Sequence, residues 1–321
     1  MLWQQQRRIE SGDSQASVEQ EATVRELEAI LQNELKWHKN SRKAGMGWKF
    51  AQGRKVLRLE KRRGKVITDP SEVPNIWQRY YKQSFSSQHL DENDQQYYIK
   101  QLDKNLTPDE ASLCEGPIYE EECLNALNTM KKEKTPGCDG LPAEFYQTFW
   151  SILGGDLVQV FNSCYNSGTL SNSQRLGIIS LLYKKGDTAD PDNWRPISLL
   201  CADYKILSKT LANRLLLVIG NVINPDQTCG VPGRFIGENV ALVRDIIEYS
   251  QAANLPGIII SLDQNKAFDR VEWCYLHRVL KAMGFGPTFL CWIKLLYTNC
   301  CQSTEHKWVF NWTFFVGRGV R

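Results

Sequence analysis

The 321-residue chain lacks several features that would assign it to a specialised class of protein. It has no apolar run of about 18 residues, the length that a membrane-spanning helix needs, so we expect no membrane partner. The first twenty residues lack the apolar core of a signal peptide. We therefore expect an intracellular protein, in the nucleus or the cytoplasm and not secreted. The ten cysteines include no C-x-x-C pair and no Cys/His spacing of the zinc-finger type.

Charge is distributed unevenly along a chain of otherwise ordinary globular composition. The net charge is only +3, but residues 36–65 carry twelve basic side chains against one acid, Glu60, which leaves 27 basic and 35 acidic residues elsewhere. A nucleic-acid backbone is a natural partner for such a segment, and a solvated linker is the alternative. The twelve basic residues are Lys36, Lys39, Arg42, Lys43, Lys49, Arg54, Lys55, Arg58, Lys61, Arg62, Arg63 and Lys65.

The spacing of apolar residues predicts a mixed α/β chain of the α+β type, without the regular alternation of a doubly wound sheet. The aromatic face from Trp77 to Phe85 is expected to belong to the core and not to stack on bases. Residues 86–96 are expected to be loop, followed by a variable connection to Pro117. We expect helices at 18–36, around 77–85, and at 119–130, 141–150, 153–165, 203–218, 238–252, 271–283 and 287–297, and strands at 177–183, 195–200 and 307–316.

One further stretch combines a very apolar run with a carboxylate. Three isoleucines and a leucine after Pro256 predict a short strand, buried on both faces, that ends at Asp263. Burying an unpaired carboxylate costs several kcal/mol, so Asp263 should reach solvent or hold a cation. It could instead cap a helix that starts near Lys266. The stretch alone leaves both interpretations open.

Five segments, in this order over about 210 residues, resemble the reverse transcriptase of non-LTR retrotransposons of the long interspersed element type. The basic region also resembles the linker that follows the endonuclease of such elements, through residues 59–67. The five segments are Lys134–Tyr146 (KTPGCDGLPAEFY), Lys184–Asp187 with Asn193–Leu200 (KKGD, NWRPISLL), Asp203–Lys209 with Ala212–Leu215 (DYKILSK, ANRL), Asp226–Gln227 with Gly233–Arg234, and Ser261–Val271 (SLDQNKAFDRV).

The resemblance implies the fingers and a partial palm of a right-hand polymerase, preceded by a helical basic linker. It divides the chain into a linker region at 1–70, a helical extension at 71–116 and the fingers and partial palm at 117–321. The implied activity is RNA-directed DNA polymerisation. The implied partners are an RNA template, a DNA primer and deoxynucleoside triphosphates, while oligomeric state is left undetermined.

The resemblance also assigns catalytic roles near Asp263. This residue matches the first catalytic aspartate and, with the backbone carbonyl of Gln264, would bind Mg²⁺ in a two-metal site. Phe268 would lie under the incoming sugar and exclude a 2′-hydroxyl, with an ordinary core phenylalanine as the alternative. Asp269 also matches the motif, but a local structural role with Arg270 or Lys266 is an equal alternative.

Nucleotide-binding roles follow from the resemblance for two other regions. Lys184 and Arg195 would bind the triphosphate, since cations offset charge that grows in the transition state. A surface hairpin with solvated cations is the alternative, and it fits Lys185 better than Arg195. The loop that contains Gln227, Gly233 and Arg234 would lie near the template or the nucleotide.

The family's second catalytic segment, Tyr-x-Asp-Asp, does not occur, and the 321 residues contain no Asp-Asp pair. A two-metal clamp needs more than one carboxylate. We therefore expect a truncated or decaying copy that does not polymerise. The alternative is a non-catalytic RNA-binding remnant that acts through residues 36–65.

Overall fold

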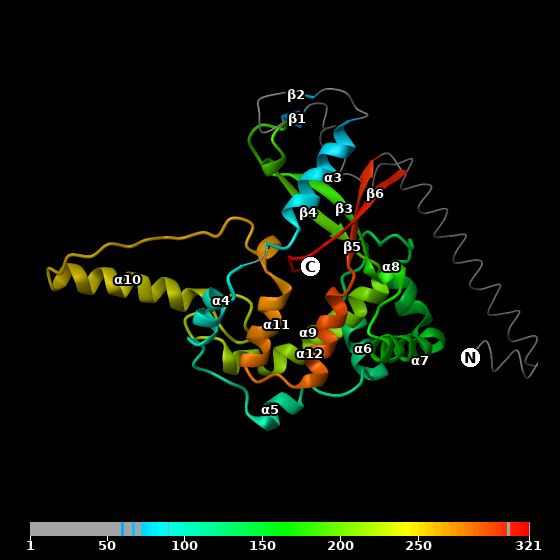
Figure 1. Cartoon of the computed structure of the whole chain (residues 1–321). Helices are drawn as coiled ribbons and strands as arrows, with labels where there is room; N and C mark the ends of the chain where they lie inside the picture. The colour runs from blue at the N-terminus through cyan, green and yellow to red at the C-terminus, as the bar shows by residue number, and fades with distance from the viewer. Residues whose placement is uncertain (1–58, 61–65, 68–71, 89, 307–308, 321) are drawn as a thin grey trace, which may run out of the picture.

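The computed structural model describes residues 59–60, 66–67, 72–88, 90–306 and 309–320. The helix expected at 18–36 and all twelve basic side chains of residues 36–65 lie outside these ranges. The described chain is mixed α/β, with a small sheet above a helical body (Figure 1). Its helices are α3 (Val73–Ser84), α4 (Glu92–Ile99), α5 (Pro108–Ser112), α6 (Glu120–Asn128), α7 (Ala143–Ser167), α8 (Asn172–Arg175), α9 (Ala202–Val222), α10 (Ile236–Ala252), α11 (Trp273–Ala282) and α12 (Pro287–Tyr297).

The main sheet has the strand order β4-β3-β5-β6, formed by β3 (Leu176–Tyr183), β4 (Trp194–Leu199), β5 (Cys301–His306) and β6 (Val309–Phe315). The β3–β4 and β5–β6 pairs are antiparallel, whereas β3 and β5 are parallel. The hairpin expected from the sequence is therefore confirmed, with Tyr183 paired to Trp194. The two residues at 59–60 and at 66–67 form a separate antiparallel pair, β1 and β2.

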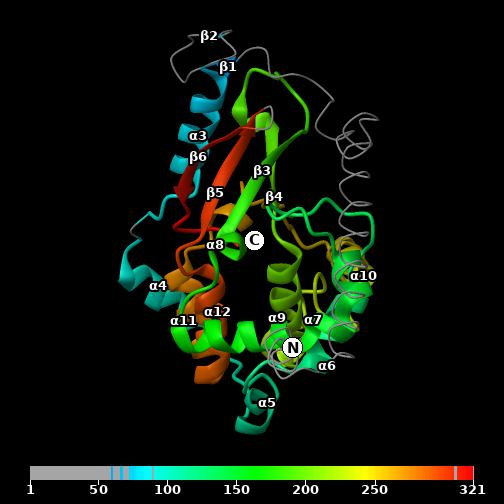
Figure 2. The same cartoon turned by 90° about the vertical axis from the view of Figure 1, so that its right-hand side faces the viewer.

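Helix α3 covers one face of this sheet (Figure 2). Its Trp77, Tyr81 and Phe85 are buried at 4%, 2% and 6% exposure, and they pack against Ile179 and Trp194 of the hairpin. These three rings are thus core, as predicted, while Tyr80 of the same helix is only partly buried. This packing fixes the hairpin relative to α3.

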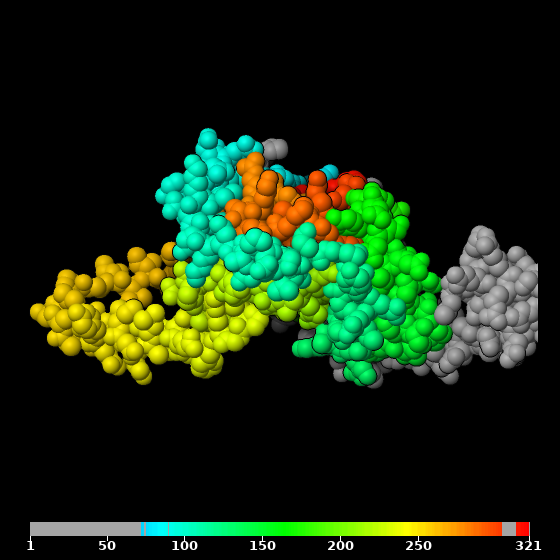
Figure 3. Space-filling view, turned by 90° about the horizontal axis from the view of Figure 1, so that it is seen from below, coloured from blue at the N-terminus to red at the C-terminus, as the bar shows by residue number. Residues whose placement is uncertain are grey.

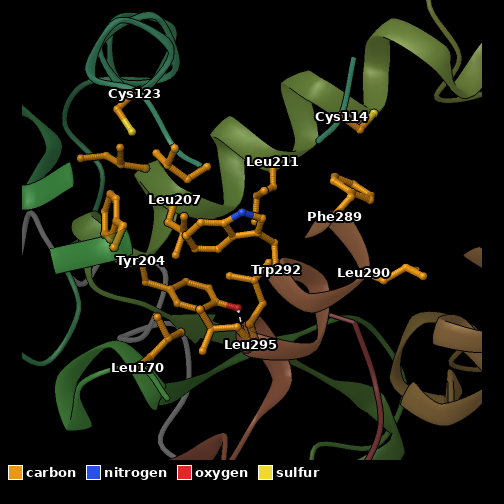
Figure 4. Close-up of a cluster of buried hydrophobic side chains, with 14 of the residues drawn as sticks. Cys114, Cys123, Leu170, Tyr204, Leu207, Leu211, Phe289, Leu290, Trp292 and Leu295 are labelled. Carbon is orange, nitrogen blue, oxygen red and sulfur yellow. Dashed lines mark hydrogen bonds between the residues drawn. The ribbon is translucent and has the colours of Figure 1, made fainter. Parts of the chain in front are cut away.

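A second core lies between α9, α12, α6 and α7 (Figure 4). Trp292 is fully buried there, beside Leu207 and Leu211 of α9, and the Tyr204 hydroxyl donates to the Leu296 carbonyl at 3.3 Å. Fully burying one such side chain contributes roughly 1.5–3 kcal/mol. The apolar faces of α9 and α12 that the sequence predicts meet in this core.

One buried cation ties this helical core together. The Arg214 guanidinium, on α9, forms an ion pair of 2.5 Å with Glu122 of α6. It also donates to four consecutive backbone carbonyls of the turn before α6, those of Cys114, Glu115, Gly116 and Pro117. Arg214 is 6% exposed, and it satisfies its buried guanidinium through these acceptors.

The two helices expected at 141–150 and 153–165 correspond to α7, which a kink at Phe149 (φ −104°, ψ 16°) divides into two helical parts. One local prediction is wrong. The segment expected to be loop and variable connection contains α4 and α5. Asp91 caps the first and Thr107 forms a capping box with Glu110 at the second, a local start signal that the sequence contains.

The strand predicted at the apolar run after Pro256 is also wrong. Residues 255–264 have no regular structure, and Ile258 and Leu262 are each 89% exposed. Together with α10 they form an arm that projects from the body (Figures 1 and 3). A strand needs partners for its backbone N–H and C=O groups, and no described strand pairs with this run. No described helix is both long and apolar enough to cross a bilayer.

We predict that Arg214→Met lowers the free energy of unfolding by about 3–5 kcal/mol, the usual cost of breaking a buried ion pair from one side. The matched control is Arg244→Met on α10, where the arginine is 68% exposed and its pair with Asp245 is surface-lying. Urea unfolding followed by circular dichroism measures both variants. Equal, small losses for the two would contradict the role given to Arg214.

Candidate functional site

The turn after Asp263 is held against the tip of the β3–β4 hairpin by a lysine. Lys266 adopts a left-handed conformation (φ 54°), which is uncommon for a residue with a side chain. Its ammonium lies 2.6 Å from a carboxylate oxygen of Asp192 and 2.5 Å from the Tyr80 hydroxyl. The Tyr80 hydroxyl in turn donates to Asp192. Asp192 belongs to the short helical turn Pro191–Asn193 that leads into β4, so three distant segments meet at Lys266.

Hydrogen bonds at this junction favour the charged form of Lys266 and the neutral form of Tyr80. Burial pulls the pKa of Lys266 down, but its hydrogen bonds to Asp192 and Tyr80 outweigh that effect and leave the pKa raised. Burial and the hydrogen bond to Asp192 raise the pKa of Tyr80. The lysine is therefore charged and the tyrosine neutral at physiological pH. This arrangement keeps the backbone at Lys266 in its strained conformation.

Asp269 lies three residues further on, within the helical turn Phe268–Arg270, and is half-buried. Burial raises its pKa, and the nearby charges of Lys266, Lys184 and Arg318 oppose the shift. Lys184, at the end of β3, is thus close enough to Asp269 to attract it. These surroundings are those expected if Asp269 has a structural role through its interaction with Lys266.

The segment 316–320 closes the other side of the turn. The backbone N–H of Val320 donates to the Phe268 carbonyl at 2.9 Å, and that of Gly319 donates to the Val271 carbonyl at 2.8 Å. Arg318 is 8% exposed at its side chain and lies 3.6 Å from the buried Glu272 carboxylate. The turn is therefore fixed from both sides by backbone bonds and an ion pair.

The predicted nucleotide-binding residues divide between this junction and the arm. Lys184 and Arg195 are exposed on the hairpin, with Arg195 opposite Leu182 in the register. Phe268 is 76% exposed, so the core-phenylalanine alternative is wrong. Asp263 and Gln264 are exposed on the irregular stretch. The helix-cap alternative for Asp263 is wrong as well, because the turn begins at Ala267 and has no side-chain cap.

The residues described do not by themselves fit the expected two-metal Mg²⁺ site. Two hard cations need several carboxylate oxygens on rigid elements. Asp263 is an exposed single carboxylate, and among the described residues it belongs to no group of three ligand atoms within 4.8 Å of one another. These residues alone therefore do not supply the ligands that a two-metal reaction needs.

The loop with Gln227, Gly233 and Arg234 lies at the end of α9. The Arg234 guanidinium donates to four backbone carbonyls there, those of Gly220, Ile223, Asn224 and Gln227. Gly233 has φ +77°, which a residue with a side chain adopts rarely. Arg234 therefore stabilises the end of α9 by satisfying its free carbonyl groups. The predicted role of the loop in nucleotide binding stays a prediction.

Sequence reasoning missed Asp192 and Tyr80 as partners of Lys266. They lie 74 and 186 residues from it, and neither has a local pattern that marks the contact. It also missed Arg214, for which a signal existed. A lone arginine on the apolar face of a predicted helix is expected to find buried acceptors.

We predict a pH-dependent effect of Asp269→Asn. Because the folded-state pKa is raised above the ordinary 3.8, wild-type stability is full below that value and declines as pH rises through the folded pKa, since the unfolded state loses its proton first. The variant lacks this decline. The free energy of unfolding of the variant, relative to that of the wild type, should therefore increase as the pH rises from 4 to 7. Urea unfolding at several pH values measures the difference. Asp245→Asn, at an exposed position, is the control, and a difference that does not change with pH would contradict the prediction.

Comparison with known proteins finds similarity over much of the described chain. Residues 183–316 match the family described as reverse transcriptase (RNA-dependent DNA polymerase). This range begins at the end of β3 and includes β4, Asp192 and Lys266, and the β5–β6 pair, whereas Tyr80 lies outside it.

Three relatives cover similar parts of the chain. The Transposon TX1 uncharacterized 149 kDa protein of Xenopus laevis is 44% identical over 207 residues, which is 64% of this chain and 16% of the relative. The probable RNA-directed DNA polymerase from transposon BS of Drosophila melanogaster is 25% identical over 65% of this chain and 23% of its own length. The Pol polyprotein from type-1 retrotransposable element R2 of Popillia japonica is 29% identical over 52% of this chain and 22% of its own.

The chain thus spans less than a quarter of the length of each of these relatives. The family match and the relatives agree with each other and with the order of motifs in the sequence. Residues 183–316 of this chain are similar to the reverse transcriptase family, and the relatives named above are proteins of transposable elements.

Proposed function

We propose that this chain supplies the fingers and part of the palm of an RNA-directed DNA polymerase that acts on an RNA template, a DNA primer and deoxynucleoside triphosphates. The observation that carries the proposal is the junction at Lys266. There the ion pair with Asp192 holds the turn that follows Asp263 against the β3–β4 hairpin. The same contact sets Lys184 near Asp269. Cations of the hairpin are therefore directed toward the segment that carries the catalytic aspartate.

In this proposal Lys184 and Arg195 bind the triphosphate. Both side chains are exposed, so they meet a ligand without first losing a buried partner. The guanidinium of Arg195 can bind phosphate oxygens in a bidentate way, whereas the ammonium of Lys184 acts as a point charge. Phe268 is exposed as well and is proposed to exclude the 2′-hydroxyl of a ribonucleotide.

Asp263 and the Gln264 carbonyl are proposed as Mg²⁺ ligands once residues 257–263 become a strand. The run is apolar enough for a strand that is buried on both faces, and it lacks a pairing partner among the described residues. Further carboxylates, of the family's Tyr-x-Asp-Asp kind, would complete the site. We propose that the 321 residues alone are inactive in polymerisation because they contain no such pair.

The division into a linker at 1–70, a helical extension at 71–116 and the polymerase part at 117–321 belongs to the same proposal. The contacts of α3 with β5 and β6 support an extension that packs on the sheet. Residues 36–65 are proposed to bind RNA through their twelve basic side chains.

The second candidate function is that of a non-catalytic RNA-binding protein, and it rests on the positive charge of residues 36–65 alone. It is favoured by twelve basic residues against one acid in thirty positions. Both proposals expect that replacing the twelve basic residues by glutamine abolishes salt-dependent RNA retention. They differ in a longer protein, where only the polymerase proposal expects substitutions at Asp263 and Phe268 to change nucleotide incorporation.

We predict that a protein extended beyond Arg321 into a Tyr-x-Asp-Asp segment incorporates deoxynucleotides on an RNA template with Mg²⁺. In that protein Asp263→Asn should lower the rate by a factor on the order of 10³, because charge stabilisation by a metal is worth several kcal/mol. Primer extension measures the rate, and Asp245→Asn on α10 is the matched control. Full activity of the Asp263 variant would remove this residue from the site. Incorporation by the 321 residues alone would refute the proposed inactivity.

The same extended protein tests Phe268. We predict that Phe268→Ala raises ribonucleotide relative to deoxynucleotide incorporation, because the smaller side chain leaves room for the 2′-hydroxyl. The ratio of kcat/KM for the two substrates measures the effect. Phe235→Ala, at another exposed phenylalanine, is the control. A ratio unchanged by the first substitution would show that Phe268 does not select the sugar.

A further inference from the structure

A cluster of potential metal ligands lies apart from the Lys266 junction, where a loop meets the start of α9. One carboxylate oxygen of Asp139, the sulfur of Cys201 and one carboxylate oxygen of Asp203 all lie within 4.8 Å of one another. The sulfur of Cys138 lies 3.5 Å from that of Cys201. Asp139 is exposed, Cys201 is buried and Asp203 is intermediate, so the cluster extends from the surface inward.

The fold brings these residues together by close backbone contact. A Cβ atom at Gly137 would lie 2.3 Å from the backbone nitrogen of Cys201, so only glycine lets the loop approach α9 this closely. Cys138 and Asp139 follow directly and thus face the first turn of the helix. The residues come from positions about sixty apart in the sequence, which is why no zinc-type spacing reveals them.

Groups around the cluster orient its carboxylates. The Gln174 side chain, on α8, donates to one oxygen of Asp203 at 2.9 Å, and the Tyr204 backbone N–H donates to the other at 2.7 Å. The Leu141 backbone N–H donates to Asp139 at 3.1 Å. Each carboxylate oxygen keeps a further lone pair for a cation. Such outer hydrogen bonds are the usual way in which proteins fix metal ligands.

The distance between the sulfur atoms of Cys138 and Cys201 suits two ligands of one metal ion better than it suits a disulfide bond. Two thiolates about 2.3 Å from one tetrahedral ion lie roughly 3.7 Å apart. The observed 3.5 Å is near that value and far from the ~2.05 Å of a disulfide bond. As thiols, both cysteines share one weak acceptor, the Ser173 carbonyl, at 3.8 and 3.4 Å.

Burial raises the pKa of the Cys201 thiol and of the Asp203 carboxyl, and the charge of Asp139 raises that of Asp203 further. Lys205 is the nearby base, but burial lowers its own pKa. A bound divalent ion would neutralise these groups and displace the thiol protons to solvent.

We propose that Asp139, Cys201 and Asp203 bind one divalent cation of the Zn²⁺ type, and that Cys138, whose sulfur lies beside that of Cys201 but outside this group of three, turns toward the ion as the fourth ligand. Thiolate ligands favour Zn²⁺ over Mg²⁺, so this site is chemically distinct from the one proposed at Asp263. The ion would fasten the loop 136–140 to the start of α9, directly after β4. It would thereby steady the strand that carries Arg195.

The test uses the whole 321-residue protein, purified with a reductant that keeps thiols free. After loading with Zn²⁺ and dialysis against metal-free buffer, elemental mass spectrometry should find one ion per chain. Loading with Co²⁺ should give thiolate-to-cobalt charge-transfer bands and the strong visible absorption of a tetrahedral site. Cys201→Ser should weaken binding by roughly 100-fold or more, at or beyond the 10–100-fold cost of losing an outer-shell partner.

Cys229→Ser is the matched control, because Cys229 is an exposed cysteine outside the cluster. It should leave the stoichiometry and the cobalt spectrum unchanged. If circular dichroism shows that the Cys201 variant does not fold, Asp139→Asn replaces it, since that side chain is exposed and the loop tolerates the change; it too should weaken binding. The proposal is overturned if the wild type retains no ion, if Cys201→Ser or Asp139→Asn binds as the wild type does, or if Cys229→Ser is the variant that loses the metal.

Discussion

The guanidinium of Arg214 is the interaction on which the helical body depends. Its ion pair with Glu122 and its four carbonyl acceptors join α9 to α6 and to the turn that precedes it. The Trp292 indole donates to one of the same carbonyls, that of Gly116, so α12 is held to the same turn. The arginine itself is only 6% exposed, so losing it would leave several of these acceptors without a donor. It thus fastens α9 to α6, and β4 leads directly into α9.

The site is organised by a second charged contact of the same kind. Lys266 is fixed to Asp192 and Tyr80, and α3 presents Tyr80 because its neighbours Trp77 and Tyr81 are buried against the hairpin. The hairpin therefore positions the turn after Asp263 through packing as well as through charge. This explains why the turn, although outside any long helix or strand, is one of the constrained parts of the structure.

Local patterns predicted most of the helices and the β3–β4 hairpin, because amphipathic spacing and alternation depend only on neighbours in sequence. The α12 bounds Pro287–Tyr297 coincide with the prediction, since a proline starts that helix and apolar residues fill one face. Long-range features could not be predicted in this way. The parallel pairing of β3 with β5, and the meeting of Cys138 with Cys201, depend on chain topology that no local window contains.

The failed strand prediction shows the limit most clearly. Residues 258–262 have the composition of a buried strand, yet strand structure requires a partner for every backbone group. The apolar side chains of α10 are exposed beside them, with Val240 at 65% and Ile246 at 52%. Apolar surface of this extent, exposed over contiguous residues, is typical of a binding surface. A partner that covers this face and pairs with the backbone of residues 258–262 would make the run a strand and fix the Asp263 carboxylate.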